Sequence, residues 1–265
     1  MLNKNDIMKI AGEKKLNPSV VSKDYALGWL LFGISKSSIG DKLIFKGGTA
    51  LSKVHFPEGW RLSEDLDFTL SGEINLVVLE KALKEEIPKI IMDAIGMEVR
   101  LKDRPHANEG FYQSRFQYVG PLGKDTVKIE ITKEEVIRKA DVKKMPNVFD
   151  YPTFDVTVYP LEEILAEKMR AILQRKSKKI RDYYDVWRLL KTNKFNRENV
   201  KTLFLEKCKG KDITFTDVNQ FFPDGIVKTL EPYLETGLTR LSREPMPSLD
   251  DMINELRKLL EEFLK

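Results

Sequence analysis

The sequence predicts an α/β core over residues 1–155 and a mostly helical domain over residues 156–265. In the first part, short alternating or continuously apolar runs, which are typical of strands, are mixed with segments of helical periodicity. From about Tyr159 onwards we find only helical periodicity. A chain of 265 residues is long enough to bury the core of one large domain or of two modest ones.

Helix and strand signals alternate along the first part. Residues 18–34 have an apolar helical pattern with Pro18 near the start, which is a favoured position for proline. Residues 42–48 indicate a short buried strand that ends in glycines, and residues 49–56 indicate a short helix. Further predicted elements are strands over 64–70, 97–102, 111–120 and 125–132, a hairpin turn over 120–125, and a helix over 74–95 that bends or ends near Pro88.

The second part predicts four helices with apolar residues at helical spacing. They cover residues 161–176, 180–191, 197–209 and 248–265. Residues 147–160 are predicted to connect the two parts.

The composition indicates a soluble folded protein and excludes several classes. The net charge is only +4, from 45 basic and 41 acidic residues, so overall charge does not argue for nucleic acid. A single cysteine, Cys208, excludes an internal disulfide framework and a cysteine-based metal cluster. The longest apolar stretch is about half as long as a membrane-spanning helix, and the N-terminus has no apolar signal region. We therefore expect a cytoplasmic protein without a membrane partner.

Residues 45–68 combine two features that point to phosphate and metal chemistry. Gly47 and Gly48 end a strand where Thr49 opens a helix, and free backbone N–H groups at such a helix start can bind phosphate. Downstream, Asp65 and Asp67 lie two apart on a predicted strand and so point to the same face, about 7 Å apart. Carboxylates so close repel each other unless a cation lies between them, and Mg²⁺ accepts such oxygen ligands. The alternative is a strand end with solvated acids.

Glu130 is the candidate for a third carboxylate. It alternates with the apolar residues of the strand over 125–132, and it would join Asp65 and Asp67 if that strand pairs beside theirs. Otherwise Glu130 lies on the solvated face of an edge strand.

The stretch KGGTALSKVH…RLSEDLDF resembles the signature of the AbiEii-type nucleotidyltransferase toxins, within the DNA polymerase β-like nucleotidyltransferase superfamily. VSKDYALGWLL upstream and LEEILAEKMRAILQR and RDYYDVWRLL downstream resemble further motifs of that family, so the resemblance covers about residues 20–190. It implies a polymerase β-like core with a mixed sheet, and a helical C-terminal domain that completes the site.

The resemblance also implies roles for individual residues. Gly47, Gly48 and Thr49 correspond to the triphosphate-binding turn, and Asp65 and Asp67 to the metal-binding acids. Lys168 corresponds to a lysine expected to contact nucleotide phosphate, and Asp182 and Asp185 to the acids of the RDxxD motif. The superfamily often has aspartate as the third acid, where this chain has Glu130.

Residue spacing draws attention to Lys168 independently. It lies on the apolar stripe of its helix, where an unpaired lysine is costly. A triphosphate, a nearby acid or a snorkelling position at the edge of the stripe would each remove this cost. Because the change removes a charge from the apolar stripe, Lys168→Ala is expected to lose most activity and NTP affinity and to leave the protein as stable or slightly more so.

Other polar residues leave alternatives open. Asp182 has the position of a helix N-terminal acid, and Asp185 is spaced for a surface salt bridge with Arg181. Arg61 has a phosphate or Glu64 as its possible partner. The basic run over residues 173–181 precedes two tyrosines and is suited to a nucleic-acid backbone, although such runs are usually solvated loops.

These observations predict an enzyme that transfers a nucleotidyl group from an NTP to an acceptor hydroxyl. Two Mg²⁺ ions are expected at Asp65, Asp67 and Glu130, with Gly47, Gly48, Thr49, Arg61 and Lys168 around the phosphates. The resemblance implies RNA, at the 3′ end of tRNA, as the acceptor, with a protein acceptor as the alternative, and a cognate antitoxin that acts separately. Rival hypotheses are a metal-dependent nuclease, whose D…ExK pattern fails at Thr132, and a non-catalytic binding module.

Overall fold

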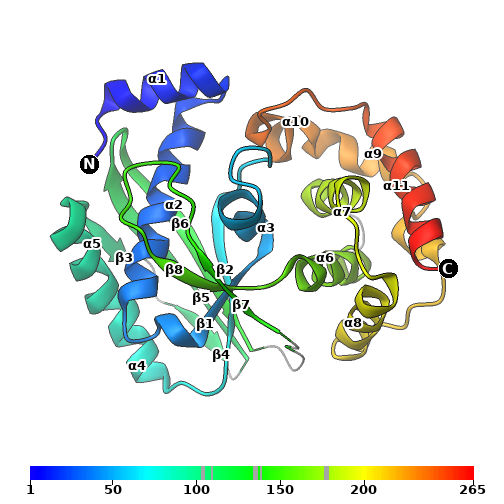
Figure 1. Ribbon diagram of the computed structural model, residues 1–265, viewed down its shortest axis with the longest axis horizontal. Coiled ribbons are helices and arrows are strands. Elements are labelled where there is room, and N and C mark those ends of the chain that lie inside the picture. Colours follow the sequence, from blue (N-terminus) through cyan, green and yellow to red (C-terminus); the bar gives the residue numbers. More distant parts are fainter. Residues whose placement is uncertain (103–104, 109, 134–136, 138, 176–178) are drawn as a thin grey trace. The chain divides into compact units, whose positions relative to one another are not determined.

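The structure is a computed structural model that describes residues 1–265 except 103–104, 109, 134–136, 138 and 176–178. The chain divides into two compact units (Figure 1). The first comprises Met1–Glu134 and Ala140–Tyr159, and the second comprises Glu135–Lys139 and Pro160–Lys265. The predicted fold class is confirmed, because the first unit contains a mixed sheet with helices and the described elements of the second are helices.

The first unit is built on an eight-stranded sheet in the order β3-β5-β6-β2-β1-β8-β7, with β4 paired to β5. The β2–β6 and β1–β8 pairs are parallel and the other pairs are antiparallel. The strands are β1 Leu43–Lys46, β2 Asp65–Leu70, β3 Val99–Leu101, β4 His106–Asn108, β5 Phe111–Gly120, β6 Gly123–Thr132, β7 Asp141–Lys144 and β8 Asp155–Val158.

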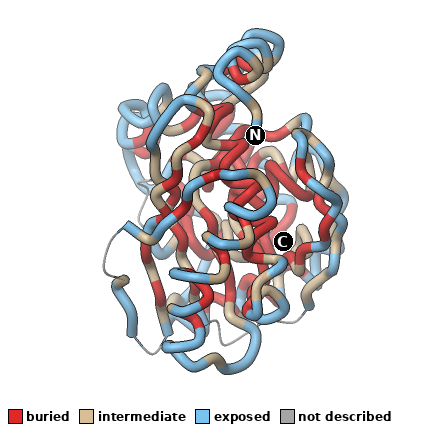
Figure 2. The backbone as a smooth tube through the Cα atoms, turned by 90° about the vertical axis from the view of Figure 1, so that its left-hand side faces the viewer, coloured by how far each residue is buried: buried red, intermediate tan, exposed pale blue. Residues whose placement is uncertain are grey.

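The alternation of side chains gives the centre of this sheet one apolar and one polar face. Leu66 and Phe68 of β2 lie beside Ile129 and Ile131 of β6, and all four are buried. The long helix α2 (Pro18–Lys36) packs against β5, β6 and β8 (Figure 1). Its residues from Val20 to Ile34 are almost all buried, because it fills the core of this unit. Figure 2 marks the buried residues of the chain in red.

The remaining helices of the first unit contain two π-helical segments. They are α1 Lys4–Lys14, η1 Gly40–Lys42, α3 Gly47–Ala50, η2 Leu51–His55, α4 Leu76–Lys81, η3 Ala82–Glu86 and α5 Ile87–Ile95. The helix predicted over 74–95 is observed as α4, η3 and α5 in direct succession up to Ile95, and the π-helical η3 ends two residues before Pro88. Proline cannot donate a backbone hydrogen bond to the preceding turn, and the wider π segment lies where that bond is lost.

The second unit packs helices on one another. They are α6 Leu161–Arg175, α7 Ile180–Thr192, α8 Arg197–Lys209, η4 Val218–Phe221, α9 Ile226–Leu230, η5 Glu231–Tyr233, α10 Leu234–Gly237, η6 Thr239–Leu241 and α11 Leu249–Phe263. Helix α6 packs against α7 and α8, and α11 packs against α7. Among the helices described, none is long and apolar enough to cross a membrane.

Three strands were missed by the sequence analysis. Strand β8 lies inside residues 147–160, which were expected to be a connection, and it pairs in parallel with β1. Strands β7 and β4 are short and pair at the edges of the sheet. The predicted hairpin is confirmed, since Gly120 of β5 pairs with Gly123 of β6.

Candidate functional site

Three carboxylates lie on the polar face of the sheet, as the strand pairing dictates. Asp65 and Asp67 are two residues apart on β2, and Asp67 is directly opposite Glu130 on the parallel strand β6. Residues opposite each other in paired strands point to the same side, so Glu130 joins the two aspartates. The condition that the sequence analysis set for Glu130, pairing of the two strands, is met. We call Asp65, Asp67, Lys128 and Glu130 the acid face.

Lysines accompany these acids. Lys128, opposite Asp65 in the register, has its Nζ 2.5 Å from Glu130 Oε2 and 3.8 Å from Asp65 Oδ2. Lys46 of β1 is opposite Asp67 on the other side of β2, and its ammonium also lies over the Tyr159 ring. The acid face is therefore partly neutralised by the chain itself.

Within this arrangement, the carboxyl group of Asp67 has a raised pKa. Burial, followed by the charges of Asp65 and Glu130, raises the pKa of the Asp67 carboxyl from 3.8 to about 6, although Lys128 and Lys46 oppose the shift. Burial would lower the pKa of Lys128, but its hydrogen bond to Glu130 and the neighbouring carboxylates outweigh burial and raise it. A further cation beside Asp67 would relieve this repulsion.

The glycine turn directly contacts the acid face. Gly47 has a φ of +76°, and a β-carbon placed there would lie 2.6 Å from Asp67 Oδ2. Only glycine satisfies both conditions, because other residues rarely adopt this φ and their β-carbon would displace the Asp67 carboxylate. The turn thus brings the start of α3 next to the acid.

Arg61 and Thr49 complete the turn. The buried Arg61 guanidinium lies against Gly48, where a β-carbon would be 3.0 Å from its Nη2, and it donates a 3.1 Å hydrogen bond to the Leu62 carbonyl. The buried Thr49 hydroxyl donates to the Asp65 carbonyl at 2.5 Å. The Thr49 side chain therefore links the turn to β2, while the N–H groups of the first helical turn have no acceptor within the helix.

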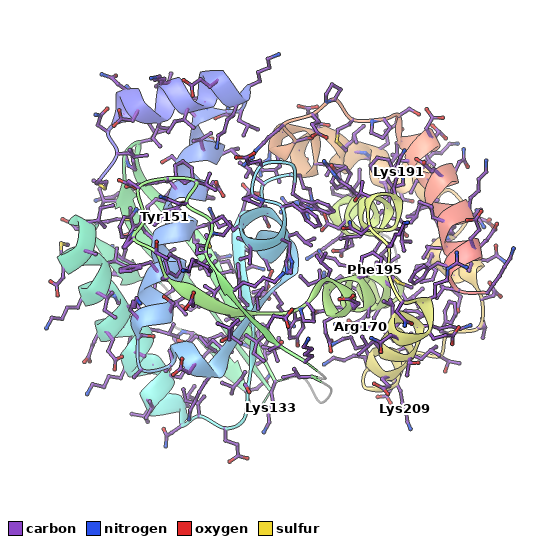
Figure 3. All side chains as sticks on the ribbon, viewed as in Figure 1. Lys133, Tyr151, Arg170, Lys191, Phe195 and Lys209 are labelled. Carbon is purple, nitrogen blue, oxygen red and sulfur yellow. The ribbon has the colours of Figure 1, made fainter. Side chains whose placement is uncertain are left out.

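A buried ion pair that sequence reasoning missed anchors the helix after the turn. Lys53 of η2 lies 2.8 Å from Asp24 of α2, and both side chains are buried. The Lys53 ammonium also lies over the rings of Phe149 and Tyr151, the latter labelled in Figure 3. Asp24 belongs to the VSKDYALGWLL motif and Lys53 to KGGTALSKVH, so two motifs treated as separate meet in one contact.

The second unit contains a separate cluster around Lys168. Lys168 of α6 lies 2.6 Å from Asp182 Oδ1 and 3.0 Å from Asp185 Oδ2, both on α7. Arg175 lies 3.3 Å from Asp182. Both aspartates are buried. Among the alternatives considered for Lys168, the structure therefore shows the one with a nearby acid.

This pairing changes the expected role of Lys168 in folding. Burial alone would raise the pKa of Asp182, but the charge and hydrogen bond of Lys168, with Arg175 and Lys179, outweigh it and lower that pKa. The expectation that removal of Lys168 leaves stability unchanged or higher assumed a lysine without an anionic partner, and the two aspartates reverse its sign.

The basic run over residues 173–181 is described only in part. Lys176 and Lys178 lie outside the described residues, whereas Arg181 donates a 2.7 Å hydrogen bond from Nε to the Gly237 carbonyl.

The acid face has the chemistry of a divalent-cation site. Its carboxylate oxygens are ligands that Mg²⁺ prefers, and the pKa of Asp67, raised first by burial and then by the charges of Asp65 and Glu130, would fall beside a further cation. In the part of the chain that the structure describes, no three acidic, histidine or cysteine side chains are close enough together to form a ready ligand set. Asp65 and Asp67 are the carboxylates that could hold a cation, whereas Glu130 Oε2 lies 2.5 Å from Lys128 Nζ.

Comparison with known families gives one match over most of the chain. The model of the nucleotidyl transferase AbiEii toxin family, of type IV toxin–antitoxin systems, matches residues 29–262. A comparison with curated protein sequences gives no match.

Solved structures with the same fold include two bacterial proteins. MenT4, a nucleotidyltransferase toxin from Mycobacterium tuberculosis H37Rv, superposes with a TM-score of 0.68 at 19% identity, covering 100% of this chain and 90% of that one. JHP933 from Helicobacter pylori gives a TM-score of 0.56 at 19% identity, covering 94% of this chain and 93% of that one. At these identities the structural likeness shows the fold alone.

Gly47→Ala is expected to destabilise the protein more than Gly72→Ala. Both glycines have a positive φ, +76° and +78°, but a β-carbon meets Asp67 at the first and nothing within 4 Å at the second. Gly72→Ala should therefore cost only the backbone term, about 1–2 kcal/mol, and urea unfolding should show a larger loss for Gly47→Ala. Equal losses would mean that Asp67 does not press on the turn.

The raised pKa of Asp67 predicts a pH-dependent stability. With a folded pKa of about 6 and an ordinary value of 3.8, the folded state holds a proton that the unfolded chain has lost. This contribution to stability is complete at low pH and is lost as the pH rises through about 6. In metal-free urea unfolding, Asp67→Asn should therefore gain stability relative to the parent as the pH rises, and a difference that is flat with pH would contradict the shift.

Lys168→Met is expected to destabilise the protein by about 3–5 kcal/mol, because it removes the ammonium that pairs with two buried carboxylates. The matched control is Lys191→Met, which removes an exposed partner 2.8 Å from Glu255 and should cost at most about 1 kcal/mol. Chemical denaturation measures both. A Lys168→Met variant as stable as the control would show that Asp182 and Asp185 do not depend on Lys168.

Proposed function

The chain belongs to the AbiEii family of nucleotidyltransferase toxins, and we propose that it transfers a nucleotidyl group from an NTP to a hydroxyl of RNA in a Mg²⁺-dependent reaction. The observation that carries the proposal is the placement of Asp67 beside both Glu130 and Gly47. A carboxylate cluster and a phosphate-type turn in contact are the two parts that this reaction needs.

The chain's own groups supply the nucleotide site of the proposal. The N–H groups of Gly47, Gly48 and Thr49 at the start of α3 point away from helical acceptors and are suited to phosphate oxygens. The Arg61 guanidinium against Gly48 adds a fixed positive charge. These groups would hold the β- and γ-phosphates and orient the α-phosphorus.

The acid face orients the reacting atoms. The acceptor oxygen forms a bond to the α-phosphorus while the bond to the pyrophosphate oxygen breaks, without a covalent enzyme intermediate. Asp65 and Asp67 would hold Mg²⁺, with Glu130 as the third carboxylate when two ions are bound. Bound Mg²⁺ supplies charge that activates the attacking oxygen and neutralises the leaving pyrophosphate.

The Lys168 cluster is assigned a part in nucleotide binding on the family resemblance. Lys168 is proposed to contact a phosphate, while Asp182 and Asp185 keep its ammonium charged and fixed. Lys168→Arg keeps the positive charge, so we expect this variant to retain the fold. It should lose NTP affinity, because a guanidinium does not replace the compact ammonium at a phosphate.

We propose that the acceptor is RNA, at the 3′ end of tRNA. We further propose that the protein acts in the cytoplasm and is controlled by an antitoxin that acts separately. The resemblance to the family implies this acceptor, and the basic run over residues 173–181 supports it, since lysines and arginines attract a phosphate backbone.

The test is a transfer assay with each labelled NTP, total RNA and Mg²⁺. Asp65→Asn and Asp67→Asn should each lower transfer by at least about 100-fold, the scale of losing a charge-stabilising group. The control Glu73→Gln, whose side chain is 92% exposed, should transfer normally. Both aspartate variants should keep or raise the melting temperature, because these acids face away from the apolar core.

The same assay decides the acceptor. Label on RNA supports the proposal, and mapping should place it at a 3′ end. Label found only on protein overturns the RNA assignment, and turnover retained by either aspartate variant overturns the metal site.

A further inference from the structure

The acid face consists of four charged side chains, of which three are carboxylates and one is an ammonium. Asp65 and Asp67 occupy β2, and Lys128 and Glu130 occupy the opposite positions of β6. Neighbouring parallel strands are about 4.8 Å apart and alternate residues about 7 Å apart. Lys128 is thus adjacent both to Asp65 across the strands and to Glu130 along its own strand.

The contacts of Lys128 are unequal. Its Nζ is 2.5 Å from Glu130 and 3.8 Å from Asp65, and the side chains of Lys128 and Glu130 are only 24% and 26% exposed. A partly desolvated pair at this distance is held more firmly than an exposed one. The Lys128 ammonium therefore pairs with Glu130 and lies farther from Asp65.

A second divalent ion would need the same oxygen atoms. The first ion can be held by Asp65 and Asp67 with little disturbance of the Lys128–Glu130 contact. An ion that also uses Glu130 must displace the ammonium or approach it closely, at a cost in Coulomb repulsion.

We propose that Lys128 is a resident cation of the acid face that holds Glu130, so that the NTP-free protein binds one divalent ion and a second must compete with Lys128. This inference rests on the proposed function. Lys128 is a positioning residue, because it acts through Glu130, and its effect is on the number and affinity of the ions.

The arrangement has a clear physical advantage for the NTP-free protein. Without Lys128, three carboxylates would lie on two neighbouring strands, with Lys46 opposite Asp67 on β1 and Arg115 opposite position 128 on β5. Lys128 lowers that repulsion in the absence of metal and keeps Glu130 on the face. It also makes loading of the second ion depend on a ligand that brings its own cation, as an NTP does.

The test is a Mn²⁺ titration of the whole, NTP-free chain, with free Mn²⁺ followed by electron paramagnetic resonance. The parent should bind one ion, Lys128→Met should bind a second ion or bind the first at least about tenfold more tightly, and Lys128→Arg should behave as the parent. Two ions on the parent, or Mn²⁺ binding by Lys128→Met that matches the parent, overturns the inference.

Two further measurements keep the test informative if Lys128→Met is unstable without metal. Its melting temperature should rise more on addition of Mn²⁺ than that of the parent, and an equal rise counts against the inference. Glu130→Gln should leave the first ion in place, and a loss of that ion overturns the inference.

Failure of the proposed function has a different signature. If neither the parent nor Lys128→Met binds Mn²⁺, the metal site at Asp65 and Asp67 is wrong, and the inference falls with it. If the parent binds Mn²⁺ through Asp65, as loss in Asp65→Asn would show, but Lys128→Met does not differ, only the role of Lys128 is wrong.

Discussion

The parallel pairing of β2 with β6 is the constraint on which the site depends. The two strands are about 60 residues apart in sequence, and their register alone puts Asp67 opposite Glu130 and Asp65 opposite Lys128. A shift of one residue would turn Leu66 and Phe68 out of the core and the acids into it. The burial of Leu66, Phe68, Ile129 and Ile131 therefore keeps the acids on the opposite face, and the observed pairing decides which residue of β6 lies opposite each acid.

Buried ion pairs elsewhere connect one helix to another. Lys53 and Asp24 join η2 to α2, and Lys207 and Glu163 join α8 to α6 at 2.8 Å. Such pairs add little net stability, but loss of one partner is costly. These pairs therefore favour the observed contacts between helices. In the first unit, the Lys53–Asp24 pair holds the helix that begins at Gly47 against α2.

The sequence predicted what depends on local pattern and missed what depends on distant partners. Period-two alternation gave β2 and β6 and put both aspartates on one face, and Gly47 and Gly48 marked the turn. It did not give the edge strands β4 and β7, whose sequences HAN and DVKK each contain a single apolar residue, or strand β8 within the expected connection. Nor could spacing reveal that Lys168 meets Asp182 and Asp185, since ion pairs between elements depend on how those elements pack. Lys128 and Glu130 are two apart on one strand, so the same alternation places them together on the acid face.

The charges around Asp67 also connect metal and nucleotide binding. Carboxylates repel a triphosphate, whereas the N–H groups after Lys46 and the Arg61 guanidinium attract it, and both kinds of group contact the same turn. Under the proposed function, a divalent ion at Asp65 and Asp67 would convert the repulsive half of this surface into an attractive one, and a bound triphosphate would in turn add oxygen ligands for the ion. Each ligand thus removes an electrostatic cost for the other, and linkage requires that the two bind more tightly together than alone by the same factor in either order.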